Sequence, residues 1–171
     1  MNCSTKHKIS NAVLFQCAWF SCVLLPAQIA VIATTVVVLV HLKMTHKKEN
    51  ELFFILSVTA LGYCMDSVFS LFGRIDLNLS GESTIYLVCV WLIFATTLNS
   101  SMSWFLSSPY RSIILGILAP VSYYAAQQFG KIKYSEPLVS TMAIHALLWG
   151  ILMLIVHKMN FDQNIQSANE R

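Results

Sequence analysis

The sequence predicts an all-α fold, an integral membrane bundle of six transmembrane helices with both termini in the cytoplasm. Three observations carry this prediction: few charges, long apolar stretches separated by short polar breaks, and basic residues concentrated in alternate breaks. Of the 171 residues, 56% are hydrophobic and 11% are charged, with a mean hydropathy of +0.63, whereas about a quarter of a soluble domain is charged. So few charged side chains cannot cover a protein of 19.2 kDa unless lipid covers the rest.

The spans are counted from the apolar stretches, because a spanning helix needs about 20 mostly apolar residues. Four stretches are clear, at residues 52–73, 85–106, 112–129 and 138–157. The first apolar region, residues 12–42, would reach roughly 46 Å as one helix, well beyond a hydrocarbon core of about 30 Å. Pro26 lacks an amide donor and disfavours helix in the residue before it. It therefore predicts a hairpin of two short spans, 10–25 and 28–42.

The distribution of basic residues predicts the orientation, because cytoplasmic loops collect Lys and Arg. With six spans and a cytoplasmic N-terminus, the basic residues on the inner side are Lys6, Lys8, Lys43, Lys47, Lys48, Arg111, Lys158 and Arg171. Those on the outer side are Arg74, Lys131 and Lys133. This asymmetry favours cytoplasmic termini and places a polar tail, residues 159–171, in the cytoplasm as a frayed segment or an interfacial helix end.

Composition and motifs also exclude several classes of function. The net charge is only +3 and no basic stripe follows any one element, so no nucleic-acid partner is expected. The five cysteines include no C-x-x-C pair, and four lie in apolar runs, where they read as small hydrophobic side chains. The chain has no H-E-x-x-H, no G-x-S-x-G and no phosphate-binding glycine loop. The sequence therefore predicts no metal and no cofactor.

Asp66 is the first candidate for a functional residue, since it is the only acidic residue within a predicted span and ionisable groups there usually face a partner or a cavity. His145 lies about as far as Asp66 from the outer end of its own span, so the two side chains are expected at matching depth. An Asp–His pair in a low dielectric can act as acid and base. Two structural alternatives remain open: Asp66 holds the bundle together, and His145 donates a single hydrogen bond to a carbonyl.

Further polar and aromatic residues predict a polar pocket in the outer half of the bundle. The candidate ligand-binding residues at this level are Gln16, Trp19, Asp66, Tyr123 and Tyr124. Pro120 should kink the fifth span and free a carbonyl group. The alternatives are that one tyrosine belongs to an aromatic belt at the membrane interface, and that Gln16 and Trp19 only bridge helices.

Asn99 is a candidate in the inner half, within an unusually polar run at residues 95–104. Such amide and hydroxyl side chains can hydrogen-bond between helices, which is the common structural use. The alternative is a hydrophilic vestibule that opens to the cytoplasm.

Four segments together resemble a family of small bacterial inner-membrane proteins known only as a domain of unknown function. These segments are residues 11–16 with Trp19, Asp66 with Ser67, residues 91–99 with Trp104, and residues 120–125. The most specific is Phe-Ala-Thr-Thr-Leu-Asn at residues 94–99. The resemblance implies a Gram-negative inner-membrane protein associated with lipid modification, and it implies no activity, substrate or catalytic residue.

The expected function is that of a small accessory protein of the inner membrane, which binds a lipid or lipophilic ligand or a partner in envelope or lipid metabolism. The expected partners are membrane lipids and either another membrane protein or a second copy of the chain. One alternative is a membrane-embedded, lipid-modifying enzyme with Asp66 and His145 as acid and base. Another is a small proton-coupled carrier, and the sequence leaves open whether the protein is an enzyme.

Overall fold

A computed structural model describes residues 3–45, 47–77 and 83–169, and most of these residues are helical. In chain order the elements are α1 (Cys3–Leu24), α2 (Ala27–Met44), α3 (Lys48–Leu71), β1 (Ile75–Asp76), α4 (Ser83–Leu98), α5 (Ser103–Leu106), α6 (Pro109–Leu118), α7 (Pro120–Gln128), β2 (Lys133–Tyr134) and α8 (Leu138–Asn169). The predicted helical bundle is therefore confirmed. The two strands form one short antiparallel ladder in which Ile75 pairs with Tyr134.

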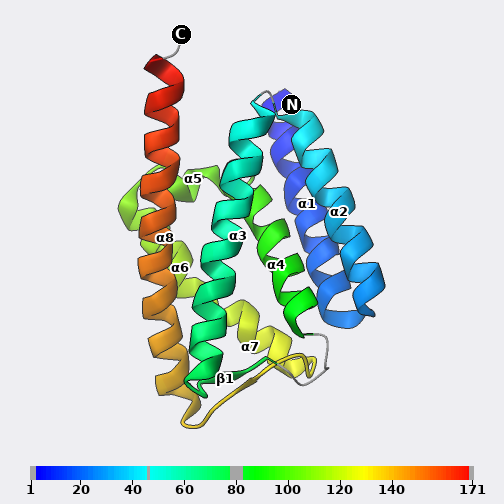
Figure 1. Cartoon of the computed structure of the whole chain (residues 1–171), viewed down its shortest axis with the longest axis vertical. Coiled ribbons are helices and arrows are strands. Elements are labelled where there is room, and N and C mark those ends of the chain that lie inside the picture. Colours follow the sequence, from blue (N-terminus) through cyan, green and yellow to red (C-terminus); the bar gives the residue numbers. More distant parts are fainter. Residues whose placement is uncertain (1–2, 46, 78–82, 170–171) are drawn as a thin grey trace.

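The chain runs back and forth along the long axis of the bundle (Figure 1). Helices α1 and α2 form a hairpin that reverses at Pro26, whose extended backbone, with φ −60° and ψ 154°, precedes the first turn of α2. Both ends of the described chain lie at one end of the bundle, together with the α2–α3 turn, while the β1–β2 ladder lies at the opposite end (Figure 1). We refer to these as the terminal end and the ladder end.

Within the described residues, three helices are long and apolar enough to cross a membrane, which indicates a membrane protein. They are α2, α3 and the segment Leu138–Gln163 of α8. Helix α4 is also apolar over Thr84–Leu98 but is shorter. The surface agrees with a lipid environment, since many large apolar side chains are exposed on it, for example Val139 at 82% and Leu147 at 67%.

Two of the predicted spans are interrupted in the structure. The predicted span 85–106 ends as helix α4 at Leu98, and the chain turns through residues 99–102 before the short α5. Ser100 and Met102 donate their amides to the carbonyl of Thr97, which closes this turn. Asn and Ser side chains compete with the helical backbone for hydrogen bonds, and this favours a turn at such a sequence.

The fifth predicted span, 112–129, is divided by Pro120 into α6 and α7. This division has the physical cause expected from the sequence, because proline cannot donate the helical hydrogen bond. Helix α8, by contrast, continues through the segment predicted as a polar tail as far as Asn169.

Close helix packing holds α6 against α8 at Gly116. A Cβ atom at this position would lie 2.6 Å from the carbonyl oxygen of Trp149 and 2.7 Å from the amide nitrogen of Gly150. Because both atoms belong to the backbone, a larger side chain could fit only if the helices moved apart. Small residues allow such close approach in membrane bundles.

We therefore expect Gly116→Ala to lower stability by about 1–2 kcal/mol, as overpacking of a fixed contact does. Thermal unfolding in detergent measures this effect. The matched control is Gly150→Ala in α8, whose Cβ would meet only a side-chain atom of Ile113 at an ordinary 3.9 Å. Equal midpoints for the two variants would contradict the packing argument.

Candidate functional site

Asp66 of α3 lies at the centre of a fully buried hydrogen-bond cluster near the ladder end. Its Oδ2 accepts the indole N–H of Trp91 at 2.8 Å and the hydroxyl of Tyr123 at 2.5 Å. Its Oδ1 lies 3.2 Å from Nε2 of His145, and both side chains are 0% exposed. The carboxylate therefore connects α3 with α4, α7 and α8. The structure brings together the two residues that the sequence places at equal depth.

His145 is fixed on its other side by Tyr134 of β2, whose hydroxyl lies 2.7 Å from Nδ1. Burial, and secondarily the negative charge of Asp66, raise the pKa of the Tyr134 phenol above its ordinary value, so this hydroxyl keeps its proton. The Tyr134 hydroxyl and the Asp66 carboxylate thus hold the two ring nitrogens of His145, one from each side. Phe69 stacks on the imidazole with ring centroids 4.6 Å apart. We call these five residues, Asp66, Trp91, Tyr123, Tyr134 and His145, the Asp66 cluster.

The Asp66 cluster is satisfied internally. Asp66 accepts three hydrogen bonds, and His145 uses both ring nitrogens. Neither Asp66 nor His145 lines any of the cavities described below. This geometry holds helices together and orients Tyr123, and because Asp66 and His145 are enclosed, neither is accessible to a molecule bound in those cavities.

An apolar groove lies beside the Asp66 cluster, between α1 and α4 on one side and α6 and α7 on the other. It consists of two adjoining cavities that share the lining residues Trp19, Val90, Ser122 and Tyr123. Including their open mouths, these cavities contain about 580 and 650 Å³ of empty space.

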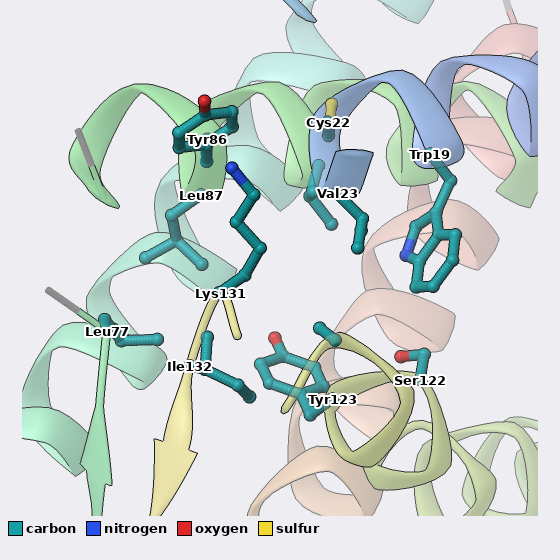
Figure 2. Close-up of a pocket in the computed structure, with 12 residues that line it drawn as sticks. Trp19, Cys22, Val23, Leu77, Tyr86, Leu87, Ser122, Tyr123, Lys131 and Ile132 are labelled. Atoms are coloured by element: carbon teal, nitrogen blue, oxygen red, sulfur yellow. The ribbon is translucent and has the colours of Figure 1, made fainter. Parts of the chain in front are cut away.

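The groove changes chemically along its length. Its inner part is lined by apolar and aromatic side chains that include Phe15, Phe94 and Trp149. Its outer part ends at Lys131, whose ammonium lies 4.1 Å from the ring centroid of Tyr86. Figure 2 shows this side chain reaching toward Tyr86, with Trp19 and Ser122 on the far side of the pocket. The two ion pairs found among the described residues do not involve Lys131.

The structure separates the residues that the sequence groups into one polar pocket. Trp19 and Tyr123 line the groove, and Tyr123 also bonds to Asp66. Gln16 and Tyr124 lie on exposed faces of α1 and α7 and line none of the described cavities. The physical reason is that polar and apolar residues are not segregated onto opposite faces of these two helices, so the sequence pattern does not identify their inner face. The structure thus shows a largely apolar groove beside an enclosed polar cluster.

Asn99 lies toward the terminal end, beside a second carboxylate–histidine pair that sequence reasoning missed. Its amide donates to Oε2 of Glu51 at 3.0 Å, and its carbonyl accepts from the amide of Asn160. Oε1 of Glu51 lies 2.8 Å from Nε2 of His41. The signal for this pair was the ten-residue separation across the α2–α3 turn, which brings the end of one helix beside the start of the next.

The described residues show no group of three or more His, Cys, Asp or Glu side chains that could hold a metal ion. The fold and the site together define a helical membrane protein with an apolar groove and two buried carboxylate–histidine pairs. A family model described as a protein of unknown function (DUF2878) matches residues 8–155, so the chain belongs to this family. The resemblance noted in the sequence is thereby confirmed. No curated protein and no solved structure matches the chain.

Proposed function

We propose that this chain is a multi-pass protein of the bacterial inner membrane that holds an anionic amphiphile in the groove between α1–α4 and α6–α7. The single observation that carries this proposal is the groove itself, which is apolar along its length and ends at one cationic side chain, Lys131. As an accessory protein, it would present or store this molecule for lipid metabolism.

The chemistry of the groove favours a ligand with one apolar chain and one negatively charged head. An acyl or isoprenoid chain would lie along Trp19, Val90 and Phe94, which offer only apolar surface. The head would lie at Lys131. The ammonium of this residue has no ion-pair partner among the described residues and is therefore available to a negative charge. The ring of Tyr86 holds this ammonium in place through a cation–π contact.

Six crossings with cytoplasmic termini remain part of this proposal. The common position of the two chain ends supports an even number of crossings (Figure 1). The excess of Lys and Arg at the terminal end supports a cytoplasmic location of that end. Lys131 and the open outer part of the groove then face the outer leaflet.

The geometry favours binding over the two alternatives. For the lipid-modifying enzyme, Asp66 and His145 would have to reach a substrate, yet both are enclosed and the ring of Tyr123 lies between Asp66 and the groove. For the proton-coupled carrier, a proton would have to pass between Asp66 and Glu51 on α3. The inward face between them carries the fully buried apolar residues Ile55 and Val58, and the hydroxyl of Thr59 donates to its own helix.

Lipid retention by the purified protein tests the proposal. We expect native mass spectrometry of the gently solubilised wild type to show a bound anionic amphiphile. Lys131→Gln should reduce its occupancy about fivefold, corresponding to roughly 1 kcal/mol for one lysine near an anionic head. Ser122→Trp should abolish binding by filling the groove, since Ser122 is exposed in the groove and its hydroxyl bonds only within α7 and to Ala119.

The matched control is Lys133→Gln, which removes an equal charge from an exposed residue outside the groove. It should leave occupancy unchanged. The groove proposal fails if the wild type retains no anionic amphiphile, or if Lys131→Gln and Ser122→Trp retain as much as the wild type at equal thermal stability.

A further inference from the structure

A second cavity opens at the terminal end, opposite the groove, and its character is polar. It contains about 930 Å³ of empty space, including its open mouth. Its lining consists of amide, hydroxyl and charged side chains with one leucine: Thr45, Lys47, Asn50, Glu51, Asn99, Ser103, Leu106, Ser107, Asn160 and Gln163. We call it the polar chamber. It shares no lining residue with the groove.

The hydrogen bonds around Glu51 give the polar chamber a negative charge. The amide nitrogen of Asn11 lies 3.5 Å from Nδ1 of His41, so Nδ1 accepts and the ring proton is on Nε2. His41 Nε2–H then donates to Oε1 of Glu51 at 2.8 Å, while Asn99 donates to Oε2 at 3.0 Å. Each oxygen of the Glu51 side chain therefore accepts one N–H donor.

This carboxylate is held rigidly at the chamber wall. Glu51 is only 8% exposed and His41 only 5%. Asn99 is itself held by Asn160 from α8, and Asn11 is held by donating to the carbonyl of Thr96. Two oxygens offer about four acceptor positions, and the two N–H donors use two of them. The remaining positions are suited to a donor with several protons, such as an ammonium group.

The rim of the chamber carries the opposite charge. Lys47 precedes the first residue of α3, is exposed and takes no part in the two ion pairs of the described residues. The first turn of α3 has no side-chain cap and carries Glu49 and Glu51, so Lys47 supplies the positive charge at this rim. An anionic group, and a phosphate in particular, suits this position.

We infer that the polar chamber binds a zwitterionic aminophosphate, with its primary ammonium on Glu51 and its phosphate at Lys47. In a membrane the corresponding molecule is an aminophospholipid, whose headgroup would enter from the leaflet at the terminal end. Free phosphoethanolamine has the same two groups. Hydroxyl and amide side chains of the chamber supply the remaining hydrogen bonds to the phosphate oxygens. This inference does not depend on a ligand in the groove.

Binding of defined lipids to the full chain in detergent tests the inference, with native mass spectrometry as the readout. The wild type should bind phosphatidylethanolamine about tenfold more tightly than phosphatidylcholine, whose methylated ammonium has no N–H to donate to Glu51. Glu51→Gln should weaken phosphatidylethanolamine binding about tenfold and leave phosphatidylcholine binding unchanged. Lys47→Gln should weaken binding of both lipids, because both contain the phosphate.

The controls are Glu49→Gln and Lys48→Gln, which make the same changes at exposed positions on the same turn outside the chamber. Lys131→Gln should not affect phosphatidylethanolamine selectivity, which separates this site from the groove.

Calorimetric titration with free phosphoethanolamine distinguishes a soluble ligand from a lipid. If free phosphoethanolamine binds and its binding depends on Glu51, the ligand is soluble. If it does not bind while phosphatidylethanolamine binds selectively, the ligand is the lipid. Equal affinity of the wild type for the two lipids overturns the inference without any variant. A well-folded Glu51→Gln protein with unchanged selectivity overturns it as well.

Discussion

Replacing Asp66 with leucine is expected to destabilise the protein by about 3–5 kcal/mol. The substitution removes the acceptor of three buried donors at once, on Trp91, Tyr123 and His145. No water replaces it, since Asp66 and His145 are 0% exposed, and an unpaired buried donor costs about 1–3 kcal/mol. Thermal or denaturant unfolding in detergent, followed by tryptophan fluorescence, measures the loss.

Asp66→Asn separates hydrogen bonding from charge at the same position. The amide oxygen of asparagine can still accept from Trp91 and Tyr123, and its N–H₂ can donate to Nε2 of His145 if the imidazole proton moves to Nδ1. The expected loss is therefore only about 1 kcal/mol. Asp162→Asn, at an exposed position of α8, is the matched control and should be neutral. If Asp66→Leu were as stable as Asp66→Asn, the three hydrogen bonds would not contribute to stability as the geometry requires.

Gly62→Ala is expected to have the second large effect, a loss of about 2–4 kcal/mol. The Cβ of alanine would lie 2.2–2.3 Å from ring atoms of Trp91, far inside contact distance. Trp91 has little room to yield, because it donates to Asp66 and stacks on Trp149 with ring centroids 4.6 Å apart. The cost adds overpacking to a displaced buried N–H donor. The change is small chemically, so a large effect would be specific to this contact.

Unfolding midpoints and ligand retention together test this prediction. The Trp91 ring also lines the inner part of the groove, so Gly62→Ala should lower retention of a groove ligand as well as stability. Gly150→Ala again serves as the control, because its Cβ meets no atom closer than 3.9 Å. If Gly62→Ala has the same unfolding midpoint as Gly150→Ala and retains as much groove ligand, then Trp91 is not held where its hydrogen bond to Asp66 places it.

Several features of the fold were predictable because one residue type determines each of them. Pro26 and Pro120 divide helices where an amide donor is missing. Asp66 and His145 were predictable as neighbours because the number of residues from the end of a span gives the depth of each residue in the membrane, and the two depths match. In each case the local chemistry or the membrane geometry leaves few alternatives.

The remainder of the site depends on which face of each helix points inward, and the sequence does not determine this. Gln16 and Trp19 lie within one turn of each other on α1, yet only Trp19 lines the groove. In lipid the outer face of a helix is as apolar as its inner face, so the usual amphipathic signal is weak. Tyr134 was missed for another reason: it belongs to a loop strand that folds back onto His145, and loop geometry has no simple periodicity.

The two buried carboxylates of α3 impose different conditions on biosynthesis. Glu51 finds its partner in His41, ten residues earlier, so this pair can form as soon as the α2–α3 turn has left the ribosome. Asp66 has its histidine 79 residues later, in the last helix. While the intervening residues are synthesised, α3 must reside in the membrane with a carboxylate that lacks this partner, at a cost of a few kcal/mol. The arrival of α8 relieves this cost, so α3 reaches its final state only after the helices between it and α8 have been made.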